Sequence, residues 1–245
     1  MTEVLQFAEP ASVQDLSRYI GRARRIQEQG IRVQGHGYVL AAWVPVMTPS
    51  SLVGRLPAVL GLRTMALSEE SYADVTAEFS AFSERIARLG PADTALSLPV
   101  ARLNAPWAAV TPPRAGWQHI GTIEDDELRT IADNGVEAVT TAVPDRAGAA
   151  VVEQVRESVW SAPLTASSLQ AHPRSSEAEA SDSRGRQEGG TSESLEVPSG
   201  AAFGAQALGF LRPAGSQGQT EIHAQGRWVR LTSAGGHILC RRTLG

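Results

Sequence analysis

The sequence contains no lysine: its 22 basic side chains are all arginine. Arginine suits bidentate contacts to phosphate and carboxylate groups. However, arginine takes the place of lysine over the whole chain and not at a single site. This pattern indicates the codon bias of a high-GC genome. With 26 acidic residues the formal net charge is −4, which argues against a protein that binds a polyanion over its entire surface.

Cysteine is nearly absent as well. The single Cys240 allows neither an internal disulfide nor a cysteine-based zinc site, and its position within a predicted strand indicates a small buried side chain. The sequence has no apolar run of about 18 residues, the length that spans a membrane. Its first ten residues lack the basic and apolar regions of a signal peptide. We therefore expect a cytoplasmic protein without a membrane partner.

The common motifs of catalysis and cofactor binding are also missing. There is no GxxxxGK[ST] loop, no GxGxxG after a strand and no GxSxG elbow. The five histidines never occur two to four residues apart, so no local metal-ligand spacing exists. The sequence thus predicts no catalytic residue, no metal and no cofactor. An enzyme whose site is assembled from distant residues stays open, and His119 near Asp125 and Asp126 is its one candidate neighbourhood.

The segments that are present alternate between helical and strand patterns. Ser12 and Asp15 resemble a capping box, which predicts a helix that ends at Gly30. Apolar residues at spacings of three and four predict a second helix over residues 68–90. Residues 31–47 are predicted to form two strands joined by a turn at residues 35–37, since glycine permits the turn. We expect an α+β fold with a mixed or antiparallel sheet covered by helices.

Composition divides the chain into three parts. Residues 1–161 form the main α+β portion. Residues 162–198 are rich in Ser, Glu, Gly and Arg without any aromatic residue, which predicts a disordered linker or insertion. Residues 199–245 are predicted to form a short helix and a β-hairpin. This last part is too short for a core of its own, so we expect it to pack on residues 1–161 and complete a single domain.

The stretch "TPPRAGW" is the first candidate for binding. Pro112 and Pro113 stiffen the backbone, and Gly116 permits a tight bend, so Arg114 and Trp117 would be presented on a rigid loop. Tryptophan and arginine are enriched at the centres of protein interfaces. Alternatively, Trp117 covers the core and Arg114 pairs with an acid.

The second candidate is the basic C-terminal hairpin, "GRWVRLTSAGGHILCRR". A turn at Ala234 and Gly235 would place Leu231 opposite Ile238 and Trp228 opposite Arg241. A short helix followed by a hairpin resembles winged-helix DNA binders, although the helix offers no side chains that could read bases. Arginines also protect the edge strand of a sheet from aggregation, so an edge hairpin is the alternative.

Five segments carry a family resemblance: "LSRYIGRARRI", "PAVLGLRTMAL", "TPPRAGW", "VPSGAAFGAQALGFL" and the hairpin sequence. Together they resemble a family of functionally uncharacterised proteins of high-GC actinobacteria. The resemblance implies a shared fold, with the linker as a variable insertion, and it implies no activity.

The sequence therefore favours a non-catalytic cytoplasmic binding or regulatory protein that engages a protein partner. The alternative is a nucleic-acid-binding protein that uses the hairpin, and a further alternative is the enzyme with a non-local site. The candidate residues for a protein partner are Arg114, Trp117 and Trp228, and those for nucleic acid are Arg227, Arg230, Arg241 and Arg242.

Overall fold

The structure is a computed structural model that describes residues 3–48, 57–109, 111–144, 146–165, 170–171 and 197–241. It confirms the predicted α+β class. Its main feature is an antiparallel eight-stranded sheet with the strand order β4-β2-β3-β10-β9-β8-β6-β7. A separate two-stranded sheet pairs β1 with β5.

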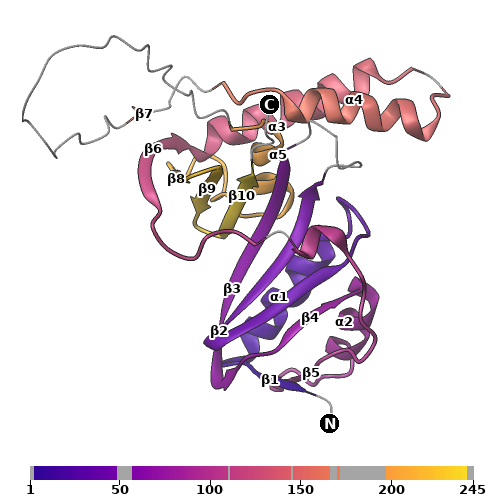
Figure 1. Cartoon of the computed structure of the whole chain (residues 1–245), viewed down its shortest axis with the longest axis vertical. Helices are drawn as coiled ribbons and strands as arrows, with labels where there is room; N and C mark the ends of the chain where they lie inside the picture. The colour runs from indigo at the N-terminus through magenta and orange to yellow at the C-terminus, as the bar shows by residue number, and fades with distance from the viewer. Residues whose placement is uncertain are drawn as a thin grey trace, which may run out of the picture.

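The elements follow one another along the chain as Figure 1 labels them. The strands are β1 (Val4–Gln6), β2 (Ile31–Met47), β3 (Ala58–Ser71), β4 (Asp74–Ala77), β5 (Ala95–Ser97), β6 (Gln118–Glu124), β7 (Gln170–Ala171), β8 (Gln219–Gln225), β9 (Trp228–Ser233) and β10 (Gly236–Arg241). The helices are α1 (Pro10–Ala23), α2 (Phe79–Ile86), α3 (Asp125–Ala142), α4 (Ala149–Ser161) and α5 (Gly200–Ala207), with a short 3₁₀ helix at Pro106–Ala109. Within the described residues, none of these helices is long and apolar enough to cross a membrane.

The predicted hairpin within residues 31–47 is wrong, because β2 runs through this region as one strand. Gly37 does have a positive φ of 63°. The pairing of β2 with β3 shifts register between Gly37 and Val39, so the glycine marks a β-bulge and the strand continues past it.

The predicted helix over residues 68–90 is also wrong in its first half. Strand β3 extends to Ser71, β4 follows, and only α2 is helical. Val75 lies opposite Val33 in the β2–β4 pairing, and both are buried. Val75 and Ala77 are buried at alternate positions of β4, as in a strand. The spacing of Val75, Phe79 and Phe82 had fitted a helix, because these buried residues of β4 and α2 happen to follow one another at intervals of four and three.

Helix α1 starts differently from the prediction. Its N-cap is Glu9, no side chain caps it, and Pro10 takes the first helical position. The predicted capping box is wrong, because Asp15 instead accepts a hydrogen bond from Arg63 Nε at 2.6 Å. The helix ends at Ala23 and does not reach Gly30.

Helices cover one face of the eight-stranded sheet, and in Figure 1 α1 lies behind β2 and β3. The main core lies between them, with Ile20 of α1, Val44 of β2 and Ile238 of β10 among its buried members. Gly61 of β3 permits the close approach of α5, since a Cβ there would lie 2.3 Å from Leu208 Cδ1. Gly135 of α3 plays the same part for Trp160, whose ring would lie 2.2 Å from an added Cβ.

The sheet joins the beginning and the end of the chain. Residues 58–62 of β3 pair with residues 237–241 of β10. Arg63 bridges the same junction, because it binds Asp15 and donates a second hydrogen bond to the Gly235 carbonyl. Arg22 of α1 donates to the Leu208 carbonyl at 3.1 Å, just beyond the C-terminus of α5. Strand pairing, core packing and two arginines thus hold these regions together.

The C-terminal hairpin has the predicted register, with Leu231 opposite Ile238 and Trp228 opposite Arg241. Its predicted place at a sheet edge is wrong. Strand β10 also pairs with β3, and β9 also pairs with β8, so both strands lie in the interior of the sheet. Protection of an edge therefore does not explain the hairpin arginines.

The predicted linker, residues 162–198, lies mostly outside the described residues. Its two ends are described, and they meet. Pro163 and Pro198 form an isolated β-bridge, and Leu164 N donates to the Val197 carbonyl at 2.6 Å.

Because these ends already lie side by side, we expect the segment between them to be dispensable for folding. Replacement of residues 166–196 by a loop of three or four Gly and Ser residues should shift the midpoint of thermal unfolding by no more than a few degrees, since shortening a loop changes its closure entropy little. Differential scanning calorimetry measures this. A collapse of the midpoint would show that the segment contributes to the fold.

Candidate interaction surface

The face of the sheet opposite the helices carries a second apolar cluster. Residues 104–109 and 111–117, which belong to the connection from β5 to β6, run across this face (Figure 1). Four of the five tryptophans gather beneath or within this segment, and Trp107 and Trp228 are buried. The cluster comprises Trp43, Leu60, Leu62, Trp107, Trp117, Trp228 and Leu239, together with Ala105 and Ala108.

Trp117 and Arg230 form the centre of this surface. The Arg230 guanidinium carbon lies 4.7 Å from the Trp117 ring centroid, which is cation–π geometry. The Trp117 indole Nε1 donates to the Pro113 carbonyl at 3.1 Å, so the loop fixes its own tryptophan. Partial burial lowers the pKa of Arg230, and the nearby Glu221 carboxylate opposes that effect. An arginine held partly out of water is available for further contacts at little additional desolvation cost.

Arg114 projects from the same loop. Its Nη2 lies 3.5 Å from His36 Nδ1, and the side chain is exposed. Burial, followed by the Arg114 charge, lowers the pKa of His36, which favours the neutral imidazole as a hydrogen-bond acceptor. The predicted alternative, in which Arg114 pairs with an acid, is not seen among the described residues.

A neighbouring ion pair holds the covering segment to the sheet. Arg32 of β2 donates to both carboxylate oxygens of Asp74, at 2.8 and 2.6 Å, and also to the Ala108 carbonyl. The hydrogen bond from Arg32 lowers the pKa of Asp74. The contribution of this pair to stability is therefore present near neutral pH and is lost as the pH falls through the lowered pKa.

Histidines border the surface on its other side. The His119 and His223 rings meet edge to face with centroids 5.3 Å apart. His237 Nδ1 lies 3.1 Å from Thr232 Oγ1. Burial lowers the pKa of His237 to about 4 and also lowers that of His223, so both rings are neutral near pH 7. Among the described residues, no three His, Cys, Asp or Glu side chains are placed to hold a metal ion.

Asp125 and Asp126, which the sequence offered beside His119 as the candidate residues of an active site, have a structural role. Asp125 is buried and accepts hydrogen bonds from Thr220 Oγ1 at 2.6 Å and from Arg212 N at 2.9 Å. Asp126 accepts from Gly215 N. The two aspartates thus fasten the segment between α5 and β8 to the start of α3, and His119 contacts His223.

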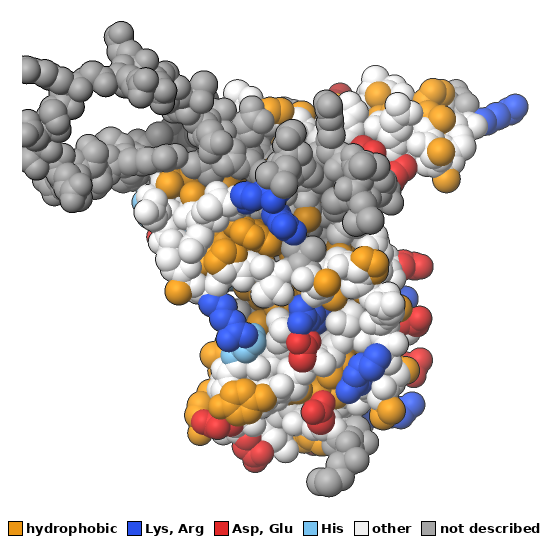
Figure 2. Space-filling view, viewed as in Figure 1, with side chains coloured by type: hydrophobic (Ala, Val, Ile, Leu, Met, Phe, Trp, Pro, Cys, Tyr) orange, Lys and Arg blue, Asp and Glu red, His pale blue; other side chains and the backbone are white. Residues whose placement is uncertain are grey.

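The structure places the other candidate residues as follows. Trp228 is only 7% exposed and packs beneath the surface. Arg227 is partly buried and Arg241 is exposed, whereas Arg242 lies outside the described residues. The candidates Arg114, Trp117 and Arg230 are those that meet on one surface. On the face seen in Figure 2, basic, histidine and hydrophobic side chains lie close together near the middle of the molecule.

The arginines of α1 lie on the opposite side of the sheet. Tyr19 and Ile20 of this helix pack into the main core, whereas Trp228 and Leu239 of the hairpin belong to the second cluster. Arg22 is engaged with backbone carbonyls, and Arg18 pairs with Asp15 at 3.7 Å. The α1 and hairpin arginines therefore do not form one continuous basic face.

Two family models match the chain. Residues 112–245 match a domain of unknown function, DUF8185, and residues 1–109 match another, DUF8010. No curated protein matches the chain significantly.

Solved structures with a similar fold include two bacterial proteins. A putative DNA polymerase III beta subunit from Eubacterium rectale aligns with 99% of this chain and 66% of its own, with a TM-score of 0.52 and 6% identity. A DNA polymerase sliding clamp from Pseudomonas aeruginosa aligns with 99% of this chain and 65% of its own, with a TM-score of 0.50 and 11% identity. This chain thus spans slightly less than two thirds of either protein. At such low identity the similarity shows a shared fold.

Proposed function

We propose that this chain, which belongs to the DUF8185 family, is a non-catalytic binding protein that engages a protein partner through Arg114, Trp117 and Arg230. The observation that carries the proposal is the Trp117–Arg230 contact, made by a stiff loop over a tryptophan-rich sheet face. Trp228 supports the surface from beneath. A cytoplasmic location and an actinobacterial origin, both predicted from the sequence, are part of the proposal.

The chemistry of the surface supports a protein partner. An aromatic ring stacked on an arginine, bordered by neutral histidines, provides a flat, partly apolar patch with several hydrogen-bonding groups. The ordering cost of binding is low, because the Trp117 indole is already fixed to Pro113. The indole is also only partly buried, so it keeps surface for a partner.

Nucleic-acid binding is the second candidate, and one observation favours it: the fold is shared with proteins described as a putative DNA polymerase III beta subunit and as a DNA polymerase sliding clamp. The charge distribution opposes it, because the net charge is −4 and the arginines are divided between two faces of the sheet. In this alternative the binding residues are Arg227, Arg230, Arg241 and Arg242.

The experiment compares variants of the full chain as bait in native-host lysate. A partner identified by mass spectrometry is then purified and titrated by calorimetry. Arg114→Ala and Trp117→Ala should each weaken its affinity about tenfold or more, the effect typical of residues at interface centres. The matched control Arg24→Ala, at the exposed C-cap of α1, should bind like wild type. A partner that binds both surface variants at wild-type affinity would contradict the proposal.

A parallel titration separates the two candidates. Wild-type protein and the quadruple variant Arg227→Ala, Arg230→Ala, Arg241→Ala, Arg242→Ala are titrated with duplex and single-stranded DNA and with RNA at 50 and 200 mM salt. We expect no appreciable binding by either protein. Wild-type binding that weakens steeply with salt and disappears in the quadruple variant would favour the nucleic-acid alternative.

A further inference from the structure

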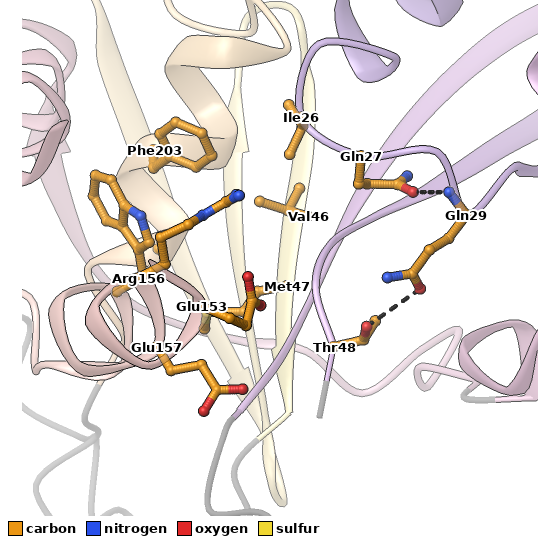
Figure 3. Close-up of a pocket in the computed structure, with 12 residues that line it drawn as sticks. Ile26, Gln27, Gln29, Val46, Met47, Thr48, Glu153, Arg156, Glu157 and Phe203 are labelled. Carbon is orange, nitrogen blue, oxygen red and sulfur yellow. Dashed lines mark hydrogen bonds between the residues drawn. The ribbon is translucent and has the colours of Figure 1, made fainter. Parts of the chain in front are cut away.

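A cavity of about 270 Å³ lies on the helix-covered side of the sheet. It opens between α4 and α5 on one wall and the end of β2 with the turn after α1 on the other (Figure 3). The cavity is separate from the Trp117 surface, which occupies the opposite face, and the inference below is independent of the function proposed there. Its volume is slightly below the range of about 300–1,000 Å³ typical of sites for drug-sized ligands.

One part of the cavity wall is apolar and firmly packed. Trp160 of α4 stacks on Phe203 of α5 with ring centroids 4.7 Å apart, and Gly135 of α3 packs against the indole ring. Ile26 and Val46 complete this part of the lining. A rigid aromatic and aliphatic lining suits the flat or branched apolar body of a small molecule.

Two hydrogen-bond donors at the cavity have no acceptor among the described residues. The Gln27 Nε2 atom is buried without a partner, while its Oε1 accepts from Gln29 N. The Arg156 guanidinium extends from α4 over the cavity (Figure 3) and makes no ion pair or hydrogen bond within the described part of the chain. A buried donor such as Gln27 Nε2 is normally satisfied, so it calls for an acceptor supplied from outside. The half-buried Arg156 side chain lines the same cavity and offers a second, charged donor.

The charges at the cavity disfavour an acceptor with two negative charges more strongly than one with a single charge. Glu153 and Glu157 of α4 also line the cavity, and their carboxylates would repel a dianion such as phosphate. A carboxylate brings one charge and two acceptor oxygens, which match an arginine and a neutral amide donor. Thr48 Oγ1 lies 3.3 Å from Gln29 Oε1, so its hydroxyl donates there and adds no competing donor.

We propose that this cavity binds a small monocarboxylic acid with an aromatic or branched apolar body. The carboxylate accepts hydrogen bonds from Arg156 and Gln27, and the apolar body lies against Phe203 and Trp160.

The test uses the full chain, labelled with ¹⁵N, and three probe acids: 3-phenylpropionate, 4-methylpentanoate and indole-3-acetate. Each acid is compared with its primary amide, which keeps the apolar body and loses the charge. We expect at least one acid to shift the Trp160 indole resonance and the Gln27 side-chain amide saturably, and to bind about tenfold or more tightly than its amide, because charge-assisted hydrogen bonds are the stronger kind.

Two variants and a control localise the effect. Arg156→Gln removes the charge and Gln27→Met removes the amide donor, and each should weaken the acid about tenfold or more while leaving the thermal midpoint within a few degrees. Arg24→Gln, an exposed arginine outside the cavity, should leave the affinity unchanged. The proposal is overturned if no acid saturates, if acid and amide bind equally, or if the acid binds Arg156→Gln as tightly as wild type.

Discussion

Removal of residues 199–245 is expected to abolish the cooperative unfolding of the remaining chain. The deletion takes away α5 and strands β8, β9 and β10. Strand β3 would lose β10 on one side along residues 58–62, and β6 would lose its pairing with β8. Tyr19 of α1, which is buried and stacks on Phe210, would lose that cover, and the exposed strand would favour aggregation.

Circular dichroism melts and dye binding to exposed apolar surface measure this loss. The replacement of residues 166–196 described above is the matched control, since it also removes a long segment and should leave the melt intact. If residues 1–198 gave a monomer with dispersed NMR signals and a cooperative melt, the single domain that we propose for residues 1–161 and 199–245 would be refuted.

Asp125→Ala is expected to lower the free energy of unfolding by roughly 2–4 kcal/mol, the cost of buried polar groups left without a charged partner. Asp125 is 1% exposed at the first position of α3. Its carboxylate accepts from Thr220 Oγ1 at 2.6 Å and from Arg212 N at 2.9 Å. Thr220 is itself fully buried. The substitution leaves the Arg212 N–H unpaired and removes a favourable charge from the helix N-terminus.

Urea unfolding at an unchanged m-value measures the difference. The neighbour Asp126 provides the control: it is exposed, accepts from Gly215 N at 3.0 Å and lies 3.6 Å from Arg129. Asp126→Ala should cost less than about 1 kcal/mol, as exposed pairs do. If the two substitutions lowered the free energy of unfolding equally, burial of Asp125 would contribute nothing to stability.

The sequence predicted the C-terminal hairpin pairing correctly because two local signals agree there. A turn at Ala234 and Gly235 is favoured by the glycine, and alternation then places Leu231 opposite Ile238. The location of the hairpin in the middle of the sheet was not predictable from local signals. It depends on the pairing of β10 with β3, and these two strands are far apart in the sequence. Local alternation carries no information about such a partner.

Elsewhere the same kind of local signal was ambiguous. Gly37 has the positive φ expected of a turn, yet it serves as a bulge within β2. Residues 68–90 contain an apolar spacing that fits a helix, although residues 68–71 and 74–77 belong to strands β3 and β4. In both places pairing with neighbouring strands determined the outcome.

The candidate sites show the same limit. The stiff backbone at Pro112 and Pro113 predicted that Arg114 and Trp117 are presented on a loop. The contact of Trp117 with Arg230 was not predictable, because it joins two segments that are far apart in the sequence. The cavity residues Gln27 and Arg156 belong to no sequence motif, so the sequence did not single them out. The sequence did contain one signal for the cavity, since Gly135 in the middle of α3 makes room for Trp160.

The position of β10 has a consequence for biosynthesis. This strand, which ends four residues before the end of the sequence given, is fourth in the order of the eight strands. A chain that emerges from the ribosome from its N-terminus therefore has β2, β3 and β4 available long before β3 can meet β10 on its other side. The edge of β3 that pairs with β10 stays open until residues 237–241 have been made, and during that time it is exposed to pairing with other chains.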